Sequence, residues 1–424
     1  MPALIFTLIE ILILFFQVWI ASLVGYLLLL TVTSFRAERH TKLQPGDQNK
    51  RFTILIPAHN EERLLPELLR CLKHLDYPKN NFEVHVVADN CTDQTALVAQ
   101  NEGVDVHVRT DKNNPGKGPA LQWFLDQMWP SEMDPDAIVI VDADTLLSAN
   151  FLSVIAGHLE RGEKVIQAYY SVRDPSQSWS SGLRYAALAV LHFLRPQGRM
   201  VLGGSVGLKG NGMIFSSEVL RRYRWSASVT EDIELHMSII LGGGRVTFAP
   251  DAIALGEMPN LLANSKSQHK RWEAGRLEMA RRYIPKLFHT AWTEAKAHHL
   301  EKAYLFFDAI MEHLVPPFSI LFGVNILLLI FNLGVVTLLS FYQSNLVSSG
   351  SFGLAKFNIL FSTILLVGQV IYLISGLRLV KAPRRAYLNL IYTPIYMVWK
   401  FIQYFQVITR RGQLEWIRTR RNEG

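Results

Sequence analysis

The chain has 424 residues, of which 49% are hydrophobic and 19% are charged. Soluble domains carry about 25% charged residues, so this composition excludes a disordered chain and is too apolar for an ordinary cytosolic enzyme. With 43 Lys and Arg and 36 Asp and Glu, the chain is also too charged to be a bundle of transmembrane helices alone. The composition therefore indicates a water-facing domain joined to membrane segments.

The formal net charge of +7 comes from the C-terminal end of the chain. Residues 378–424 contain ten Lys and Arg and only two acids, and they adjoin apolar segments. Basic residues in such a position are typical of contact with an anionic membrane surface. We therefore expect a membrane as a partner and no nucleic acid.

The first apolar segment predicts a transmembrane helix over about residues 5–32, followed by a cytosolic linker to residue 49. About 20 apolar residues cross a bilayer core, and residues 11–34 contain no charge. Arg36 and Arg39 follow this segment. Because basic residues mark the cytosolic side, we expect an integral cytoplasmic-membrane protein with its N-terminus outside and its central residues in the cytosol.

A second apolar block, residues 314–377, predicts two further transmembrane helices, because it holds two long charge-free runs separated by a Ser/Gly-rich loop. The part 386–409 is harder to assign, since it is apolar but contains Pro394 and Lys400. Both of its flanks are basic, so we expect residues 378–424 to form an interfacial or re-entrant helix and a basic cytosolic tail. A fourth crossing is the alternative.

Between the two blocks, residues 50–285 alternate short β-branched runs with helical stretches. Strands are expected at 52–58, 82–89, 104–109 and 137–144, with helices at 64–75 and 95–101. This alternation predicts an α/β domain with a doubly wound, mostly parallel sheet. Ligands bind such sheets at the carboxyl ends of the strands. The amphipathic residues 286–313 are expected to lie along the membrane.

Two acidic motifs in this domain have both a functional and an ordinary interpretation. Asp142 and Asp144 follow an apolar run, and a turn there can bring both carboxylates to one Mg²⁺ or Mn²⁺ ion that bridges a diphosphate. The same pattern occurs in simple strand-terminal turns. Likewise, Thr230 before Glu231 and Asp232 is also an ordinary helix start.

Several motifs considered together and in chain order carry more information. They are PAHNEE (57–62), VVADNCTDQTA (86–96), NPGKGPALQ (114–122), DAD (142–144), TED (230–232) and QHKRW (268–272). In this order, and just before membrane segments, they resemble the membrane-integrated family 2 glycosyltransferases, which include cellulose, chitin and hyaluronan synthases. The tail QLEWIRTRR (413–421) also resembles the end of related bacterial members.

The resemblance implies a GT-A-type nucleotide-sugar-binding domain inserted between transmembrane helices. It implies that a sugar is transferred from a nucleotide-diphosphate sugar with inversion at the anomeric carbon. We expect the donor to be a UDP-sugar rather than a GDP-sugar. Asp232 would be the general base with Glu231 beside it, and Asp142 and Asp144 would hold Mg²⁺ or Mn²⁺. The donor-binding residues would be Pro57, Ala58, Glu61, Asp89, Lys117, Asp142, Gln268 and Arg271.

On the acceptor side, the resemblance implies that Trp272 stacks on the acceptor near the membrane. Gly210 and Asn211 belong to a Gly-rich stretch that either approaches the acceptor or is only a tight connection. The expected activity is the extension of a growing polysaccharide. Because three transmembrane helices are few for an export channel, we expect a homo-oligomer or additional export subunits to complete it. Transfer of one sugar to a lipid acceptor, forming a glycolipid, is the alternative. A more distant alternative is a membrane component that binds a nucleotide without catalysing a reaction.

Overall fold

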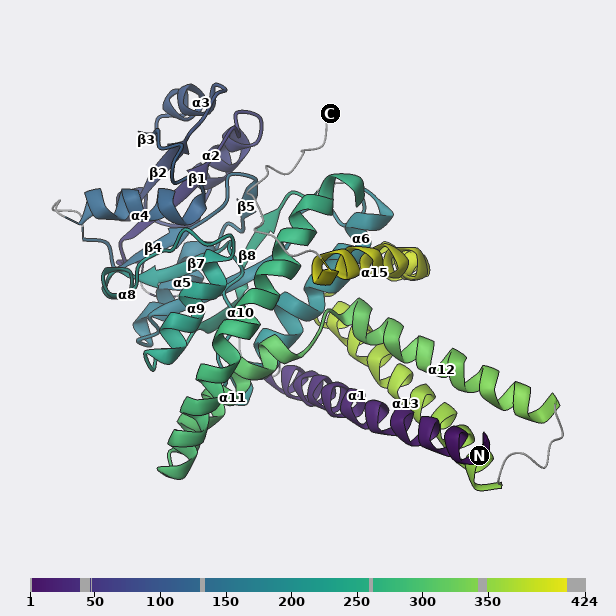
Figure 1. Cartoon of the computed structure of the whole chain (residues 1–424). Coiled ribbons are helices and arrows are strands. Elements are labelled where there is room, and N and C mark those ends of the chain that lie inside the picture. Colours follow the sequence, from purple (N-terminus) through teal and green to yellow (C-terminus); the bar gives the residue numbers. More distant parts are fainter. Residues whose placement is uncertain are drawn as a thin grey trace.

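The structure is a computed structural model. It describes residues 2–38, 46, 48–129, 134–258, 262–341 and 349–409. An α/β domain with one eight-stranded sheet carries several long helices on one side (Figure 1). The order of strands in the sheet is β3-β2-β1-β4-β7-β6-β8-β5. The tail motif at 413–421 lies outside the described residues.

The first half of the sheet is parallel, as the sequence predicts. It consists of β1 (Phe52–Ala58), β2 (Phe82–Asp89), β3 (Asp105–Arg109) and β4 (Ala137–Ile140). Their β-branched residues form nearly continuous apolar runs because helices cover both faces of the sheet. Alternate residues of β1 accordingly enter different cores: Ile54 and Ile56 pack on one face, and Leu55 packs on the other.

The second half is mixed, but with four parallel and three antiparallel pairings the sheet as a whole is mostly parallel, as expected. The second half contains β5 (Thr145–Leu147), β6 (Val165–Val172), β7 (Met213–Ser216) and β8 (Thr247–Gly256). Strand β7 runs antiparallel to both β4 and β6, β8 is parallel to β6, and β5 is antiparallel to β8. Strand β5 therefore lies at the edge of the sheet, separated from β4 by three strands although only four residues join the two in the chain.

Helices cover both faces of the sheet. On one face lie α2 (Leu65–Lys73) and α5 (Phe151–Glu160), and on the other lie α4 (Lys117–Met128) and α9 (Glu231–Leu241). In α2 the buried residues Leu65, Leu68, Leu69 and Leu72 have the spacing of one helical face. The short elements are η1 (Lys79–Asn81), α3 (Thr95–Asn101) and α8 (Ser217–Arg222).

Two groups of helices connect this domain to the apolar segments. The first is α6 (Trp179–Leu188), the π-helical segment η2 (Ala189–Leu194) and α7 (Arg195–Val201), which follow one another directly. The second is a helical hairpin of α10 (Leu262–Lys296) and α11 (Leu300–Leu314). Residue 285 therefore lies inside a helix rather than at the end of one.

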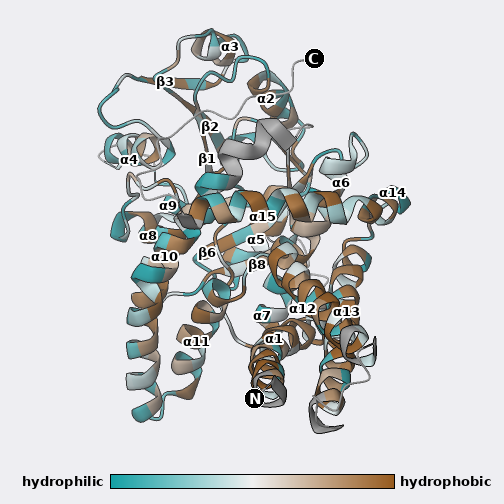
Figure 2. Cartoon of the chain, turned by 45° about the vertical axis from the view of Figure 1, so that its right-hand side comes forward, coloured by the Kyte–Doolittle hydropathy of each residue, from teal (hydrophilic) through white to brown (hydrophobic). Residues whose placement is uncertain are grey.

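Within the described residues, three helices are long and apolar enough to cross a membrane. They are α1 (Pro2–Glu38), α12 (Phe318–Phe341) and α13 (Ser349–Leu379). Figure 2 shows them as mostly hydrophobic helices that leave the more hydrophilic domain together. Polar side chains join α1 to α13: Gln17 Nε2 donates to Ser362 Oγ at 2.7 Å, and Asn358 Nδ2 donates to Glu10 Oε2 at 2.7 Å. Such bonds hold helices together where water is absent.

The last described helix, α15 (Thr393–Thr409), follows α14 (Arg384–Leu388) and η3 (Asn389–Tyr392). It lies crosswise to the apolar helices at their end nearest the domain, and it contacts α10 and α12 (Figure 2). Lys400 Nζ lies 3.2 Å from Glu273 Oε1 of α10, and both side chains are mostly buried. This ion pair fixes α15 against the helix that contains the QHKRW motif.

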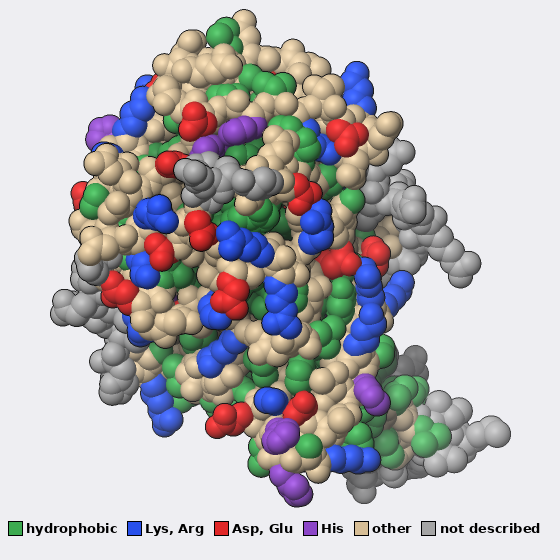
Figure 3. Space-filling view, turned by 90° about the vertical axis from the view of Figure 1, so that its left-hand side faces the viewer, with side chains coloured by type: hydrophobic (Ala, Val, Ile, Leu, Met, Phe, Trp, Pro, Cys, Tyr) green, Lys and Arg blue, Asp and Glu red, His purple; other side chains and the backbone are tan. Residues whose placement is uncertain are grey.

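The face of the domain turned away from the apolar helices is charged. Figure 3 shows Lys and Arg side chains interspersed with Asp and Glu over this face, with smaller hydrophobic areas between them. Mixed charges of this kind suit contact with water. The apolar surface of the molecule is instead carried by α1, α12 and α13 on the other side.

Candidate active site

A cavity of about 660 Å³ extends from the carboxyl ends of the central strands to the apolar helices. Its inner end is lined by Ala58 at the end of β1, Asp89 at the end of β2, and the turn after β4. Its outer end is lined by side chains of α1, α12, α13 and α15. One continuous space therefore joins the sheet to the segments that the sequence assigns to the membrane.

Four of the predicted donor-binding residues line the inner end: Pro57, Ala58, Glu61 and Asp89. The Asp89 carboxylate is held by Arg109, whose Nη1 lies 2.5 Å from Oδ1, and both side chains are buried. The sequence analysis did not single out Arg109. Its position at the end of β3, next to β2 in the sheet, is visible only once the strands are paired.

Two asparagines shape the loops that carry these residues. Asn60 and Asn90 have φ angles of 57° and 50°, a left-handed conformation that Asn tolerates better than most residues. Asn60 Oδ1 accepts a hydrogen bond from the backbone N–H of Thr92 at 2.7 Å. The loop after β1 is thus tied to the loop after β2, and Glu61 N donates a hydrogen bond to Thr95 Oγ1 at 2.8 Å.

Lys117 lines the cavity at the start of α4. Its Nζ contacts both the carboxylate of Asp142 and the carbonyl oxygen of Gly210. Burial alone would lower the pKa of Lys117, but the charges of Asp142 and Glu231 outweigh burial and raise it. Lys117 is therefore a fixed cation beside the DAD turn, where a phosphate contact was predicted.

Asp142 and Asp144 both line the cavity, in the turn that joins β4 to β5. Thr145 N donates to the Asp142 carbonyl at 3.1 Å, which closes the turn. Among the described residues, no group of three or more His, Cys, Asp or Glu could hold a metal ion. Two carboxylates nevertheless suit Mg²⁺ or Mn²⁺ that is bound jointly with substrate phosphates, because such ions keep most of their ligands from phosphate and water.

Glu231 and Asp232 begin α9 and line the same cavity. Burial, together with the neighbouring charge of Asp232, raises the pKa of Glu231 to about 8. Burial likewise raises the pKa of Asp232. Thr230 is the N-cap residue of α9 and the two acids lie in its first turn, so the motif is also a helix start, although the Thr230 side chain makes no capping bond. Two neighbouring acids with raised pKa values at a cavity are typical of acid–base chemistry.

The QHKRW motif lies in α10, opposite the acid pair. Arg271 and Trp272 line the cavity, and Trp272 is 43% exposed. Burial lowers the pKa of Arg271, while Glu231 opposes this effect. Gly275 allows the close approach, since a Cβ there would lie 2.2 Å from Thr230 Cγ2. The side chain of Gln268 lies outside the described part of this helix.

Gly210 and Asn211 occupy different positions. Gly210 lines the cavity beside Asp232, with a φ of 76° that favours glycine. Asn211 is 1% exposed, and its Oδ1 accepts from Asp142 N at 3.2 Å while its Nδ2 donates to Thr145 Oγ1 at 2.6 Å. Asn211 therefore holds the DAD turn from behind, a position that does not suit the predicted direct contact with an acceptor.

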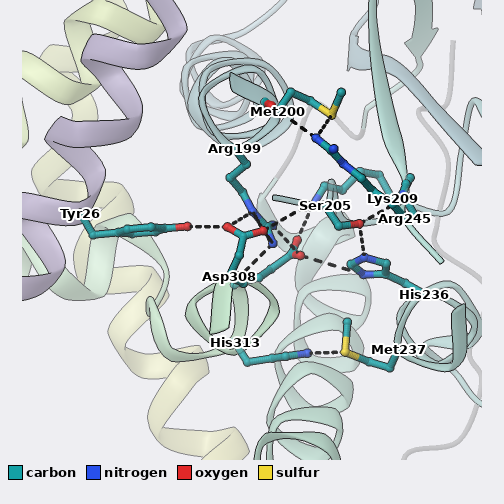
Figure 4. Close-up of polar contacts among 12 residues, drawn as sticks. Tyr26, Arg199, Met200, Ser205, Lys209, His236, Met237, Arg245, Asp308 and His313 are labelled. Atoms are coloured by element: carbon teal, nitrogen blue, oxygen red, sulfur yellow. Dashed lines mark hydrogen bonds and ion pairs between the residues drawn. The ribbon is translucent and has the colours of Figure 1, made fainter. Parts of the chain in front are cut away.

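A buried charge cluster supports the loop that carries Gly210 (Figure 4). Lys209 Nζ lies 3.0 Å from Glu312 Oε1, and Glu312 Oε2 lies 2.7 Å from Arg199 Nη1. Arg199 also binds Asp308, which accepts a hydrogen bond from Tyr26 Oη of α1 at 3.2 Å. The cluster thus connects an apolar helix with the loop beside Asp232.

The cluster is balanced in charge. Burial would raise the pKa of Glu312, but Lys209 and Arg199 hold it well below its usual range. Burial lowers the pKa of the adjacent His236 to about 3, so this ring is neutral at pH 7. Two cations then face two carboxylates. These residues were not predicted as a group, because no local sequence pattern relates α7 to α11.

The cavity lies at the carboxyl ends of the strands, where α/β sheets bind their ligands, and sequence comparison names the family. The profile described as "Glycosyltransferase like family 2" matches residues 49–275, more than half of the chain. The chain therefore belongs to this family. This confirms the predicted family and the predicted α/β fold of the GT-A type, flanked by apolar helices at both ends.

Curated relatives are distant and cover only part of the chain. The β-monoglucosyldiacylglycerol synthase of Trichormus variabilis is 28% identical over 211 residues, which are 47% of this chain and 43% of that protein. The probable glycosyltransferase YdaM of Bacillus subtilis is 24% identical over 245 residues, 56% of this chain and 57% of that protein. The chain thus spans about half the length of these relatives.

Among solved structures, the chain is similar to the mannosyltransferase PcManGT from Pyrobaculum calidifontis in complex with GDP-Man and Mn²⁺. The identity is 17%, the TM-score is 0.49, and the match covers 88% of this chain and 97% of that one. A fragment of Staphylococcus aureus TarS in complex with UDP-GlcNAc matches with 18% identity and a TM-score of 0.39, covering 76% of this chain and 91% of that one.

Proposed function

We propose that the chain is an inverting glycosyltransferase that moves a sugar from a nucleotide-diphosphate sugar to an acceptor hydroxyl at the membrane. The observation that carries this proposal is the single cavity in which Asp142, Lys117 and the Glu231–Asp232 pair lie together and which continues to the apolar helices. The basic residues Arg36 and Arg39 support a cytosolic position for the catalytic domain.

The donor would occupy the inner end of the cavity. Glu61 and Asp89 would contact the nucleoside, and Lys117 and Arg271 would contact the diphosphate, together with Gln268 of the same motif. Asp142 and Asp144 would hold Mg²⁺ or Mn²⁺, which would supply positive charge to the leaving diphosphate. That the donor is a UDP-sugar rather than a GDP-sugar stays a prediction.

Transfer would then be a single displacement at the anomeric carbon. The acceptor oxygen forms a bond to this carbon, and the bond to the diphosphate oxygen breaks with its electron pair. Asp232 takes the proton of the acceptor hydroxyl, and Lys117 and Arg271 bind the departing charge. Because Asp232 lies beside Gly210, the acceptor would approach along that loop.

The lining of the outer end favours a lipid acceptor over the growing polysaccharide that the sequence analysis put first. It includes Leu30 of α1, Phe318 and Phe322 of α12, Leu373 of α13 and Met397 of α15. Sugar hydroxyls beside such side chains would lose hydrogen bonds to water without replacement, whereas lipid chains would not. The relative from Trichormus variabilis is named as a synthase of a glucosyl lipid.

Purified full-length chain, supplied with Mn²⁺ or Mg²⁺ and a panel of UDP- and GDP-sugars, tests the reaction. We expect release of the nucleoside diphosphate from one donor, and a fall in turnover of about 10²–10⁴-fold in Asp232→Asn, the usual contribution of a general base. Donor binding, measured by calorimetry, should be retained. Asp251→Asn, an exposed acid, is the matched control.

Labelled donor and membrane lipids distinguish the two acceptors. One discrete lipid-soluble product supports single transfer to a lipid, and a polydisperse water-soluble product supports a polysaccharide. Absence of turnover with every donor, or unchanged turnover in Asp232→Asn, would contradict the proposed reaction itself.

A further inference from the structure

The outer end of the cavity contains an arginine that the proposed reaction does not use. Arg195 begins α7, directly after the π-helical segment η2, and lines the cavity. Its Nε donates a hydrogen bond to Tyr372 Oη at 2.7 Å, and its Cζ lies 5.8 Å from the centre of that ring. Tyr372 belongs to α13 and is fully buried. The guanidinium is thus fixed by an apolar helix.

Within the described ranges, no carboxylate pairs with Arg195. Arg199, one turn further along α7, is in contrast bound by Asp308 and Glu312. Nη2 of Arg195 is buried and has no hydrogen-bond partner among the described residues. A buried donor without an acceptor costs about 1–3 kcal/mol, and more when it is charged. An anionic ligand in the cavity would supply both an acceptor and a balancing charge.

The surroundings of Arg195 decide what kind of anion fits. Phe318 of α12 packs against Tyr372 with ring centres 5.7 Å apart, so the fixed guanidinium lies next to an apolar wall. Phe318, Phe322 and Leu373 line the cavity at this end. A free phosphate ion would leave this wall without contacts. A phosphate attached to hydrocarbon chains would satisfy the arginine and cover the wall together.

We propose that Arg195 binds the phosphate of an anionic lipid acceptor, whose chains lie against Phe318, Phe322 and Leu30. This inference rests on the proposed transfer to a lipid and specifies the chemistry of that lipid: a phosphodiester headgroup that also carries a free hydroxyl. Arg195 then acts as a specificity residue, because it positions the headgroup while Asp232 deprotonates the hydroxyl.

The test compares two lipids that both carry a primary hydroxyl, phosphatidylglycerol and diacylglycerol, in neutral detergent micelles with full-length chain. We expect transfer to phosphatidylglycerol to be at least about tenfold more efficient, since a charge-assisted hydrogen bond accounts for a factor of this size. Arg195→Gln should raise KM for phosphatidylglycerol about tenfold with a smaller change in kcat, and Arg195→Lys should recover part of the loss. Arg224→Gln, an exposed arginine paired with Asp126, is the control.

Native mass spectrometry of the detergent-solubilised chain measures lipid binding without turnover. We expect phosphatidylglycerol to remain bound to the wild type and to be lost from Arg195→Gln. Equal occupancy in both proteins, or equal use of the two lipids, would overturn the inference. If glycerol phosphate displaced bound phosphatidylglycerol as strongly as the lipid itself does, the site would recognise phosphate alone. This result would overturn the proposal that the hydrocarbon chains are also bound. Binding of phosphatidylglycerol that depends on Arg195 but is not followed by transfer would contradict the proposed function and not the lipid-binding role of Arg195.

Discussion

Arg199 and Asp308 form a bidentate ion pair across 109 residues of sequence, with Nη2 2.7 Å from Oδ2 and Nε 2.9 Å from Oδ1. Both side chains are buried. Asp308 Oδ2 also accepts a hydrogen bond from Ser205 N at 3.0 Å. The pair therefore joins α7, α11 and the loop that leads to Lys209 and Gly210, and the position of this loop beside Asp232 depends on it.

Removing one partner of this pair should destabilise the whole protein. Asp308→Asn leaves Arg199 with one carboxylate fewer, and breaking a buried pair in this way costs about 3–5 kcal/mol. We expect a lower midpoint of thermal unfolding in detergent, measured by tryptophan fluorescence. Asp126→Asn, which breaks an exposed pair with Arg224, should cost less than about 1 kcal/mol. Equal effects of the two variants would show that the buried pair does not hold the loop.

Activity should fall at alkaline pH because of Glu231. Burial and Asp232 raise the pKa of this carboxyl to about 8, and its ionisation would place a new negative charge beside the proposed position of the diphosphate. We expect kcat/KM to decline above about pH 8, and Glu231→Gln to abolish this decline in a pH–rate profile. A decline of the same size in Glu231→Gln would assign it to another group.

The same shift has a consequence for stability. A carboxyl whose pKa is raised on folding binds more protons in the folded state, so the free energy of unfolding falls as pH rises from about 4.5 to 8. Glu231→Gln should remove this part of the pH dependence in urea unfolding. A steeper fall in the variant would contradict the assigned direction.

Metal binding should depend on Asp144 together with the donor nucleotide. We expect Asp144→Asn to weaken Mn²⁺ binding in the presence of UDP by at least about tenfold, as expected when one carboxylate of a two-carboxylate site is lost. The electron paramagnetic resonance signal of free Mn²⁺ measures this without turnover. Asp251→Asn should leave the Mn²⁺ titration unchanged. Transfer should also stop when the ion is chelated with EDTA.

Two glycines near α1 should respond differently to alanine. A Cβ on Gly198 of α7 would lie 2.4 Å from the carbonyl oxygen of Leu30, whereas nothing lies within 4 Å of a Cβ on Gly25. Gly198→Ala must push α1 away from the domain and should cost about 1–3 kcal/mol, as overpacking does. Gly25→Ala should be nearly neutral. Thermal unfolding of both variants in the same detergent compares them directly.

The parts of the fold that follow from local patterns were predicted well. The expected strands at 52–58 and 82–89 have the bounds of β1 and β2, and the helix at 95–101 has those of α3. Strand β4 ends at Ile140, earlier than expected, because the turn around Asp142 already closes with Thr145. The mixed half of the sheet could not be predicted, since strand order depends on pairings between distant segments.

The candidate site divides in the same way. Residues in motifs, such as Lys117 and Asp232, could be found from sequence because their neighbours in the chain carry the pattern. Arg109 and Arg195 could not, because their roles come from partners on other elements, Asp89 for the first and Tyr372 for the second. Charge pairs between distant segments leave no periodic signal in a single sequence.

The pairing of Arg199 and Lys209 with acids of α11 limits how the enzyme can be divided. A fragment that stops at residue 285, where the family motifs have ended, would contain both cations but neither Asp308 nor Glu312. It would also lack the apolar partners of α1 in α12 and α13. We therefore expect that the part with the family motifs does not fold alone, because α11 and the apolar helices beyond these motifs supply the partners that complete its interior.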